Sequence, residues 1–380
     1  MHLTIKIFLQ QEKEYALYDL NNIVPNRTTS YNEVDVLKVG EHYDILTLGE
    51  HHLFPCIILS LIQTSFERFC INSEPPSILG VDATFNICDY NVTITTYKHL
   101  LLVKSNTEEH PVMIGPTIIH SHKTFDSYYT LPSNIVRFKP NAVNLKSFGT
   151  DEETNIHRAF TITFQKADHL LCSIHVKDNI VKQAKKLGMK ENEVLWDIFG
   201  KISGETKIKG LVDCETEEEF EEMYEKISEK WKVKPNGPKF IEYFENFKKN
   251  SMKEKMLSSV RIKCGLGNPP EPYTQNANES INSMIKRSKE SGKLTLKQTV
   301  KLMQDEVKKQ EEKVKLALIG KGDWKLAKGY QQFFIIESKF YNMIPTQKKA
   351  EIDKFNTFLP DAEKQDTPRK SDIIQKKKIN

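Results

Sequence analysis

The chain has 380 residues, of which 38% are hydrophobic and 28% charged, and its formal net charge is +4. This length predicts about two or three structural units, and the composition is typical of a soluble protein with a well-solvated helical part. The six cysteines form no CxxC or CxC pair, which excludes a disulfide framework and favours reduced, intracellular thiols. Residues 1–6 lack the basic start and apolar core of a signal peptide. The most apolar window, residues 53–62, is too short to span a bilayer.

The charge is distributed unevenly along the chain. Residues 213–230 contain nine acidic residues against two lysines, a net charge of −7. Residues 251–330 contain seventeen Lys and Arg against nine acidic residues, a net charge of +8. Basic faces attract phosphate backbones in a salt-dependent, sequence-independent way. The basic stretch therefore indicates a nucleic-acid partner, with a solvated helix surface as the alternative.

From residue 77 to about residue 180, the predicted order of elements is β-β-β-α-β-α-β-α. Residues 1–75 offer only a strand at 3–8 and an apolar helix at 53–70, before the Pro75-Pro76 pair. From there, β-branched and apolar runs predict strands, and apolar residues at helical spacing predict helices. The expected strands are 78–89, 92–103, 112–119, 147–150 and 169–176, and the expected helices are 124–136, one capped by Asp151 and one after the fifth strand.

Three antiparallel strands followed by two crossover units predict the fold class. It is α/β, with a ribonuclease H-like, mixed five-stranded sheet and flanking helices. In such a sheet the first and fourth strands lie side by side. This places Asp82, inside the first strand, next to Asp151, at the end of the fourth.

The second half is charged and helical. Residues 181–264 are expected to form an all-helical insertion, because apolar residues recur at helical spacing from Phe220 to Ile227. The core is expected to resume at residues 265–320, where Asn278 caps a helix. The expected division of the chain is 1–75 of uncertain structure, 76–180 as the first part of the core, 181–264 as the insertion, 265–320 as the end of the core, and 321–380 as a C-terminal helix with a partly disordered basic tail that is weakly patterned after Pro345.

Three acidic residues stand in unlike contexts. Asp82 lies inside the apolar run 78–85, Asp151 precedes a helical pattern, and Glu279 opens another helix. A carboxylate in an apolar strand is unfavourable unless its charge is compensated, and three carboxylates brought together repel one another. A bound divalent cation removes both problems, and two such ions about 3.5–4 Å apart can clamp both oxygens of a phosphodiester displacement. The acids therefore indicate a metal-dependent phosphodiester enzyme.

Each acid also has an ordinary structural explanation when it is taken alone. Asp82 could be a strand-edge acid paired with a lysine, and Asp151 a helix N-cap. Glu279 could be a first-turn acid favoured by the helix dipole.

Four short motifs point to a family. They are GVDATF at 80–85, FGTDEE at 148–153, LCSIH at 171–175 and NESIN at 278–282. In order and spacing they resemble the Mutator-like (MULE) transposase domain, over about residues 77–302. The resemblance implies a DDE-type DNA transposase with a ribonuclease H-like fold and a helical insertion before the last acid. It also implies that Asp82, Asp151 and Glu279 are the catalytic residues and hold two Mg²⁺ or Mn²⁺ ions.

The implied reaction is metal-dependent cleavage of phosphodiesters at the ends of a mobile element, followed by strand transfer into target DNA. The implied partner is double-stranded DNA, bound by a homo-oligomer in the nucleus, without membrane association.

Cys172 and His175 have the spacing of half a zinc site. A structural zinc needs four ligands, and no second pair lies nearby in the sequence. In the family a C/DxxH pair follows the last core strand close to the active site. The resemblance therefore implies a supporting role in the site or a DNA contact, with packing and metal binding as alternatives.

Two further groups are candidate DNA contacts. In some relatives an aromatic residue of the insertion stacks on a displaced base, which is worth about 1–3 kcal/mol, and Trp231 could do so unless it lies in a core. Lys286, Arg287 and Lys289 follow Glu279 on the same expected helix. They are candidate phosphate contacts, with a solvated face as the alternative.

The chain also departs from the family pattern. Many members carry an N-terminal zinc-binding DNA module and a C-terminal CxC…CxH finger, and this sequence has neither. A truncated or domesticated copy of such an element is one possibility, and an enzyme that still nicks DNA but no longer transposes it is a second. A catalytically silent, host-adopted DNA- or chromatin-binding protein is another. A cellular ribonuclease H or exonuclease fits less well, because such enzymes need no long helical insertion before the last acid.

Overall fold

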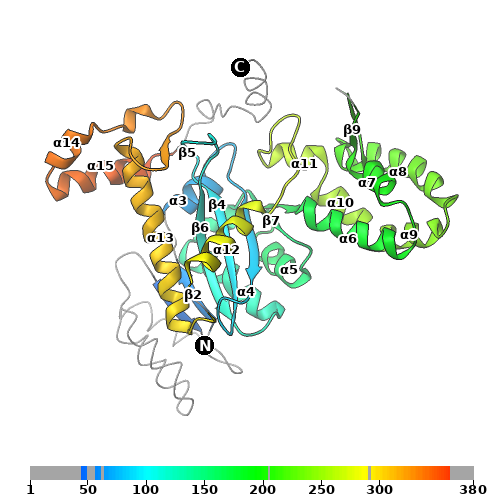
Figure 1. Cartoon of the computed structure of the whole chain (residues 1–380), viewed down its shortest axis with the longest axis horizontal. Coiled ribbons are helices and arrows are strands. Elements are labelled where there is room, and N and C mark those ends of the chain that lie inside the picture. The colour runs from blue at the N-terminus through cyan, green and yellow to red at the C-terminus, as the bar shows by residue number, and fades with distance from the viewer. Residues whose placement is uncertain (1–43, 49–55, 61–63, 204–205, 290–291, 360–380) are drawn as a thin grey trace, which may run out of the picture.

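The computed structural model of the protein describes residues 44–48, 56–60, 64–203, 206–289 and 292–359. The strand expected at residues 3–8 and the tail at 360–380 lie outside these ranges. A seven-stranded mixed sheet stands at the centre (Figure 1). In spatial order its strands are β1 (Asp44–Leu48), β2 (Cys56–Ser60), β6 (Val112–His120), β4 (Asn91–Lys98), β3 (Leu79–Thr84), β7 (Ser147–Thr150) and β8 (Asp168–Leu171).

Five of these strands have the predicted arrangement. β6, β4 and β3 pair antiparallel, whereas β3, β7 and β8 pair parallel, so the first and fourth predicted strands are neighbours. The sheet is nevertheless larger than the five strands predicted, because β1 and β2 extend it beyond β6. The helix expected at 53–70 is wrong in its first half, which forms β2; a short apolar run fits a buried strand as well as a helix.

The expected strand at 92–103 is interrupted. β4 ends at Lys98 and the chain turns, so that β5 (Leu102–Lys104) leaves the sheet and pairs antiparallel with β11 (Trp324–Leu326). The first and fifth expected strands are also shorter than predicted, since β3 ends at Thr84 and β8 at Leu171.

Helices cover both faces of the sheet (Figure 1). The helices are α3 (Thr64–Cys70), α4 (Phe125–Phe138), α5 (Thr154–Thr163), α6 (Ser173–Lys186), α7 (Glu191–Phe199), α8 (Glu217–Lys232), α9 (Gly237–Phe244), α10 (Asn250–Lys255), α11 (Ser258–Lys263), α12 (Asn276–Ser288), α13 (Leu296–Leu318), α14 (Glu337–Asn342) and α15 (Pro345–Thr357).

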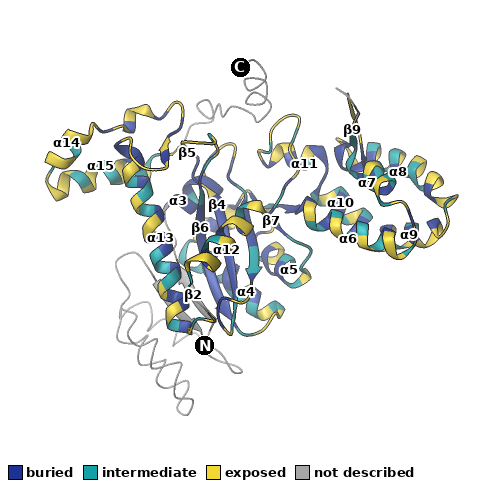
Figure 2. Cartoon of the chain, viewed as in Figure 1, coloured by how far each residue is buried: buried dark blue, intermediate teal, exposed yellow. Residues whose placement is uncertain are grey.

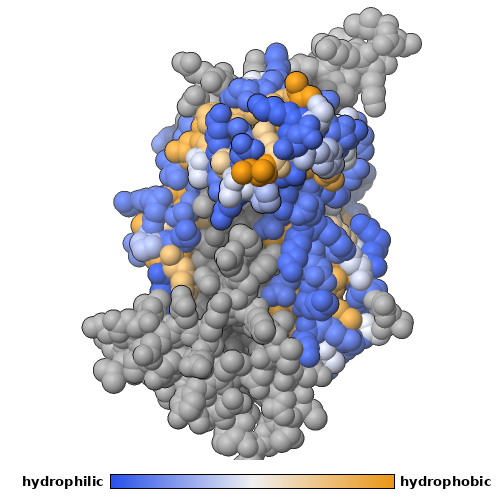
Figure 3. All heavy atoms as spheres, turned by 90° about the vertical axis from the view of Figure 1, so that its left-hand side faces the viewer, coloured by the Kyte–Doolittle hydropathy of each residue, from blue (hydrophilic) through white to orange (hydrophobic). Residues whose placement is uncertain are grey.

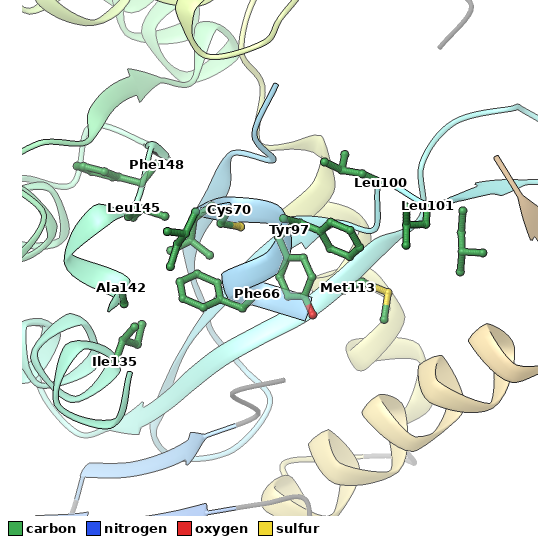
Figure 4. Close-up of a cluster of buried hydrophobic side chains, with 14 of the residues drawn as sticks. Phe66, Cys70, Tyr97, Leu100, Leu101, Met113, Ile135, Ala142, Leu145 and Phe148 are labelled. Carbon is green, nitrogen blue, oxygen red and sulfur yellow. The ribbon is translucent and has the colours of Figure 1, made fainter. Parts of the chain in front are cut away.

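Each face of the sheet has its own apolar core, because successive side chains of a strand point to opposite faces. On one face, α3, α4 and α5 pack on buried strand residues such as Val81 and Tyr97. Figure 4 shows Phe66 of α3 beside Tyr97 of β4, in an edge contact with ring centroids 6.5 Å apart. On the other face, α12 and α13 pack on Ile94 and Ile119. Figure 2 shows these strands buried between outward-facing, exposed helix surfaces.

A separate helical unit, α6 to α11, extends to one side of the sheet (Figure 1). Its own core contains Phe220, Tyr224, Trp231, Phe240 and Phe244. The expectation of an all-helical insertion is wrong in one respect, since β9 (Lys201–Ser203) and β10 (Thr206–Ile208) form a two-stranded ribbon between α7 and α8.

The C-terminal part is more ordered than expected. The tail after Pro345 is weakly patterned in sequence, yet residues 345–357 form α15. Phe355 is fully buried, and its carbonyl oxygen accepts a hydrogen bond of 2.6 Å from Arg68 of α3. Ile352 and Phe358 pack against the same core, so one side of the helix is anchored while the other faces water. Figure 3, which faces α14 and α15, shows a mainly hydrophilic surface with scattered hydrophobic spots.

Candidate active site

Asp82 and Asp151 are brought together by strand pairing. In the parallel ladder of β3 and β7, Leu79 lies opposite Phe148 and Gly80 opposite Gly149. Asp82 lies two residues further along β3 and Asp151 directly follows β7, so the two carboxylates come close enough to interact, and both residues are partly buried. The expected neighbourhood of the two strand segments is thus confirmed.

The two carboxylates influence each other electrostatically. Burial, and after it the nearby charge of Asp151, raise the pKa of Asp82 to about 6. His175 and a hydrogen bond from Asn282 act in the opposite direction. At neutral pH the pair therefore carries negative charge that its surroundings only partly compensate.

The prediction that Asp151 caps the next helix is wrong. The N-cap residue of α5 is Glu153, and Asp151 Oδ1 instead accepts a hydrogen bond of 2.9 Å from the Glu153 backbone nitrogen. Its neighbour Glu152 pairs with the buried Lys248 and accepts a 2.6 Å hydrogen bond from Asn179. These contacts tie the helical unit to the core directly beside Asp151.

Cys172 and His175 lie at the start of α6, close to the two aspartates. Cys172 is the N-cap residue, fully buried, and its Sγ accepts a hydrogen bond of 3.4 Å from the Gln275 backbone nitrogen. Burial opposes ionisation of the thiol, but hydrogen bonds from the His175 side chain and backbone lower its pKa. The hydrogen bond to Cys172, helped by the charges of Asp151 and Asp82, raises the pKa of His175 to about 9. The positive charge of protonated His175 thus lies near the aspartates, beside a thiol whose ionisation it favours.

Two further histidines, His169 and His157, lie close to the end of β7. His169 bonds Thr150 Oγ1 at 2.8 Å through Nε2, and its ring stacks on His157 with centroids 4.6 Å apart. Across the part of the chain that the structure describes, no three Asp, Glu, His or Cys side chains form a group that could hold a metal ion.

Glu279 is set apart from the aspartate pair. It lies in the first turn of α12 and is exposed, one turn before Asn282. The structure therefore brings two of the three predicted acids together and leaves the third on the adjacent helix. Asn278, expected to cap this helix, is instead its third residue and buried, where it bonds Thr96 Oγ1 at 3.0 Å and the Ile94 carbonyl at 3.3 Å.

The segment that leads into α12 carries site residues that sequence reasoning missed. Gln275 Nε2 donates to the Val81 carbonyl at 2.6 Å, one residue before Asp82. Asn282 Nδ2 donates to Asp82 Oδ2 at 2.7 Å. Tyr273 packs against Gly149, where a Cβ atom would lie 2.0 Å from the ring. The only sequence signal was the run of amides in QNANESIN at 275–282.

Trp231 is a core residue, so its proposed role in base stacking is wrong. Its exposure is 2%, its Nε1 donates to Asp197 Oδ2 at 2.9 Å, and it packs on Phe240 and Phe244. Trp196 of the same unit is 45% exposed, with Lys201 Nζ 4.8 Å from its ring centroid. An indole accessible to a base is therefore found on α7.

Replacing Trp231 by alanine is expected to lower the free energy of unfolding by about 3–5 kcal/mol, because a large buried side chain is lost. Trp196→Ala is the matched control, expected to change it by less than about 0.5 kcal/mol. Urea denaturation of both variants measures the difference. Equal losses would contradict the assignment of Trp231 to the core of the helical unit.

Of the three predicted basic residues, two are exposed on α12, and Lys289 follows the end of the helix and is half-buried. Lys286 and Arg287 are exposed, whereas Lys289 Nζ donates to the Asn86 carbonyl at 2.7 Å. Two more cations lie over aromatic rings: Lys123 Nζ is 3.6 Å from the Phe85 centroid, and Arg158 stacks on Phe125. Phe85 directly follows β3, the strand of Asp82.

The sequence matches no known family model and no curated protein. None of the helices in the described ranges combines the length and the apolar character that a bilayer crossing requires.

Proposed function

We propose that the chain is a DDE-type, Mutator-like DNA transposase of ribonuclease H-like fold, in an active, truncated or domesticated form. The supporting observation is the parallel pairing of β3, which contains Asp82, with β7, which ends one residue before Asp151. The strand order β6-β4-β3-β7-β8 and the helical unit between β8 and α12 agree with this proposal.

The residues around Asp82 are suited to a divalent cation. Two neighbouring carboxylates, one with a pKa raised to about 6, gain most from a compensating positive charge. Asp82 and Asp151 would hold Mg²⁺ or Mn²⁺, with Glu279 as the predicted third acid of the two-ion site. Such ions supply an activated water and stabilise the charge on the attacked phosphate. The chain's own part is to fix Asp82 within β3 and Asp151 directly after β7, the neighbouring strand, because strands hold a site more rigidly than loops do.

Double-stranded DNA is the proposed partner, bound by a homo-oligomer in the nucleus. Exposed Lys286 and Arg287 on α12 can contact phosphates, as can Lys123 and Arg158 beside their aromatic partners. Exposed Trp196 can stack on an unpaired base.

The test is a cleavage and strand-transfer assay with Mg²⁺ or Mn²⁺ on double-stranded DNA. Asp82→Ala, Asp151→Ala and Glu279→Ala are each expected to reduce cleavage by about a hundredfold or more, since each removes a charge that the transition state requires. Asp89→Ala is the control, because Asp89 is an exposed acid that pairs with Lys293 at 2.9 Å. Undiminished cleavage in the Asp82 and Asp151 variants would refute the assignment.

The exposed position of Glu279 favours a second candidate, a host-adopted DNA- or chromatin-binding protein without catalysis. In that case the wild-type chain binds DNA in a salt-dependent manner and cuts none with either ion. Asp82→Ala would then leave DNA affinity unchanged.

A further inference from the structure

Within the described ranges, Asn282 is the one side chain that donates a hydrogen bond to Asp82. It lies on the buried side of α12, with an exposure of 8%, and its Nδ2 is 2.7 Å from Asp82 Oδ2. Its Oδ1 is also buried and has no hydrogen-bond partner among the described residues. Buried polar atoms are nearly always paired, so an unpaired amide oxygen beside a carboxylate requires an explanation.

The distance between the two groups fits the edge of a coordination octahedron. Mg²⁺ binds oxygen at about 2.0–2.1 Å in nearly ideal octahedral geometry, so adjacent ligand oxygens lie about 2.9 Å apart. A half-turn of the amide about its terminal torsion exchanges Oδ1 and Nδ2 and places the oxygen about where the nitrogen now stands, 2.7 Å from Asp82 Oδ2. Without an ion, two oxygens at that separation repel each other, and the nitrogen faces the carboxylate. With an ion between them, both oxygens become ligands.

The helix holds Asn282 firmly in this place. Ile281 and Ile285 anchor α12 in the apolar core of that sheet face, and Asn278 bonds the backbone of β4. Gly80 leaves the room for this approach, since a Cβ there would lie 2.3 Å from Asn278 Oδ1. Glu279, by contrast, is exposed on the same turn of the helix.

We propose that Asn282 is a neutral third ligand of the cation held by Asp82 and Asp151, its amide turning so that the oxygen faces the ion. This inference rests on the proposed function for the two aspartate ligands. Two carboxylates and one amide balance the charge of a single divalent ion and leave other positions for water and phosphate oxygens. Glu279 is then free to serve a second ion or to act only when DNA is bound.

Mn²⁺ binding to the full chain without DNA tests the proposal, by calorimetry and by the electron paramagnetic resonance signal of free Mn²⁺. Asn282→Ala is expected to weaken Mn²⁺ binding by at least about tenfold. Asn282→Asp is expected to bind at least as tightly as wild type, because it restores an oxygen ligand. If Asn282 only donates a hydrogen bond to Asp82, Asn282→Asp is instead expected to bind Mn²⁺ more weakly than wild type. The new carboxylate cannot donate a hydrogen bond and repels Asp82.

Asn134→Ala is the matched control. Asn134 is also buried, also has an unpaired Oδ1 and donates to the Thr130 carbonyl at 2.8 Å, but the structure shows no carboxylate bonded to it. Asn134→Ala is therefore expected to leave the Mn²⁺ affinity of the chain unchanged.

The outcomes separate this inference from the proposed function. If Asp82→Asn abolishes Mn²⁺ binding while Asn282→Ala binds as wild type, Asn282 is no ligand and the aspartate pair stands. If Asn282→Asp binds more weakly than wild type, the ligand role is likewise overturned, even where the alanine variant fails to fold. Undiminished Mn²⁺ binding by Asp82→Asn overturns the aspartate site itself.

Discussion

Asp82→Asn is expected to raise the free energy of unfolding by about 1–2 kcal/mol at pH 7.5 in the presence of EDTA, while removing cleavage. The pKa of Asp82 is raised to about 6 by burial and by Asp151, against about 3.9 in an unfolded chain. The folded state therefore binds the proton more tightly than the unfolded state, and stability falls as the pH rises from about 4 through about 6. The full shift corresponds to nearly 3 kcal/mol, reduced here because the carboxyl group is partly exposed. An asparagine avoids this penalty.

Urea denaturation of wild type and variant between pH 3.5 and 8 measures the effect. The two stabilities are expected to converge below about pH 4, where Asp82 is protonated in both states. Added Mg²⁺ should stabilise the wild type and not the variant, since only the folded aspartate site binds the ion. Asp89→Asn, at an exposed acid, serves as the control. Equal stabilities of wild type and Asp82→Asn at pH 7.5 would contradict an unfavourable charge at this position.

The central strands could be predicted because their signals are local. β-branched runs mark β4 and β6, and the crossover pattern after them fixes which strands can be neighbours. The partners of short apolar runs could not be predicted. β5 pairs with β11, more than 200 residues later, and nothing in three residues of strand specifies a partner at that distance.

The two tryptophans of the helical unit show a second limit. Trp196 and Trp231 both lie on amphipathic helices, and helical spacing shows which residues share a face. The side that becomes buried depends on neighbours contributed by α9, such as Phe240 and Phe244. Only the folded unit distinguishes the core indole from the exposed one.

The charged residues of the candidate site could be predicted from the sequence, whereas its amide residues could not. An aspartate within an apolar strand attracts notice because its burial is unfavourable. Asparagines near a helix start are ordinary, since they commonly act as caps. The sequence predicts such a cap at Asn278, whereas the rotation of α12 turns Asn278 and Asn282 toward the sheet and Glu279 toward solvent. The angle at which a helix docks is a tertiary property, and it decides which residue touches Asp82.

Gly149→Ala is expected to destabilise the protein by about 2–3 kcal/mol. It is also expected to disturb the site, although it adds only one methyl group and removes no polar group. The added Cβ would lie 2.0 Å from Cζ of Tyr273, a buried, rigid ring that has no flexible end to move aside. Overpacking of this kind typically costs about 1–3 kcal/mol. The Tyr273 carbonyl accepts a hydrogen bond of 2.9 Å from Ser173 at the start of α6, and Gln275 bonds Val81 two residues later. Displacing the ring therefore moves the segment that positions α12 over Asp82.

A double-mutant cycle with Tyr273→Ala identifies the cause. Removing the ring opens the space into which the new methyl group points, so Gly149→Ala is expected to cost at least about 1 kcal/mol less in the Tyr273→Ala background. Gly188→Ala is the control: no atom lies within 4 Å of its Cβ position, and only its φ of +67° opposes the change. Additive losses in the cycle would mean that the ring and the glycine are not in contact. A coupled loss, together with weaker Mn²⁺ binding in Gly149→Ala, would link the packing of Tyr273 to the geometry at Asp82.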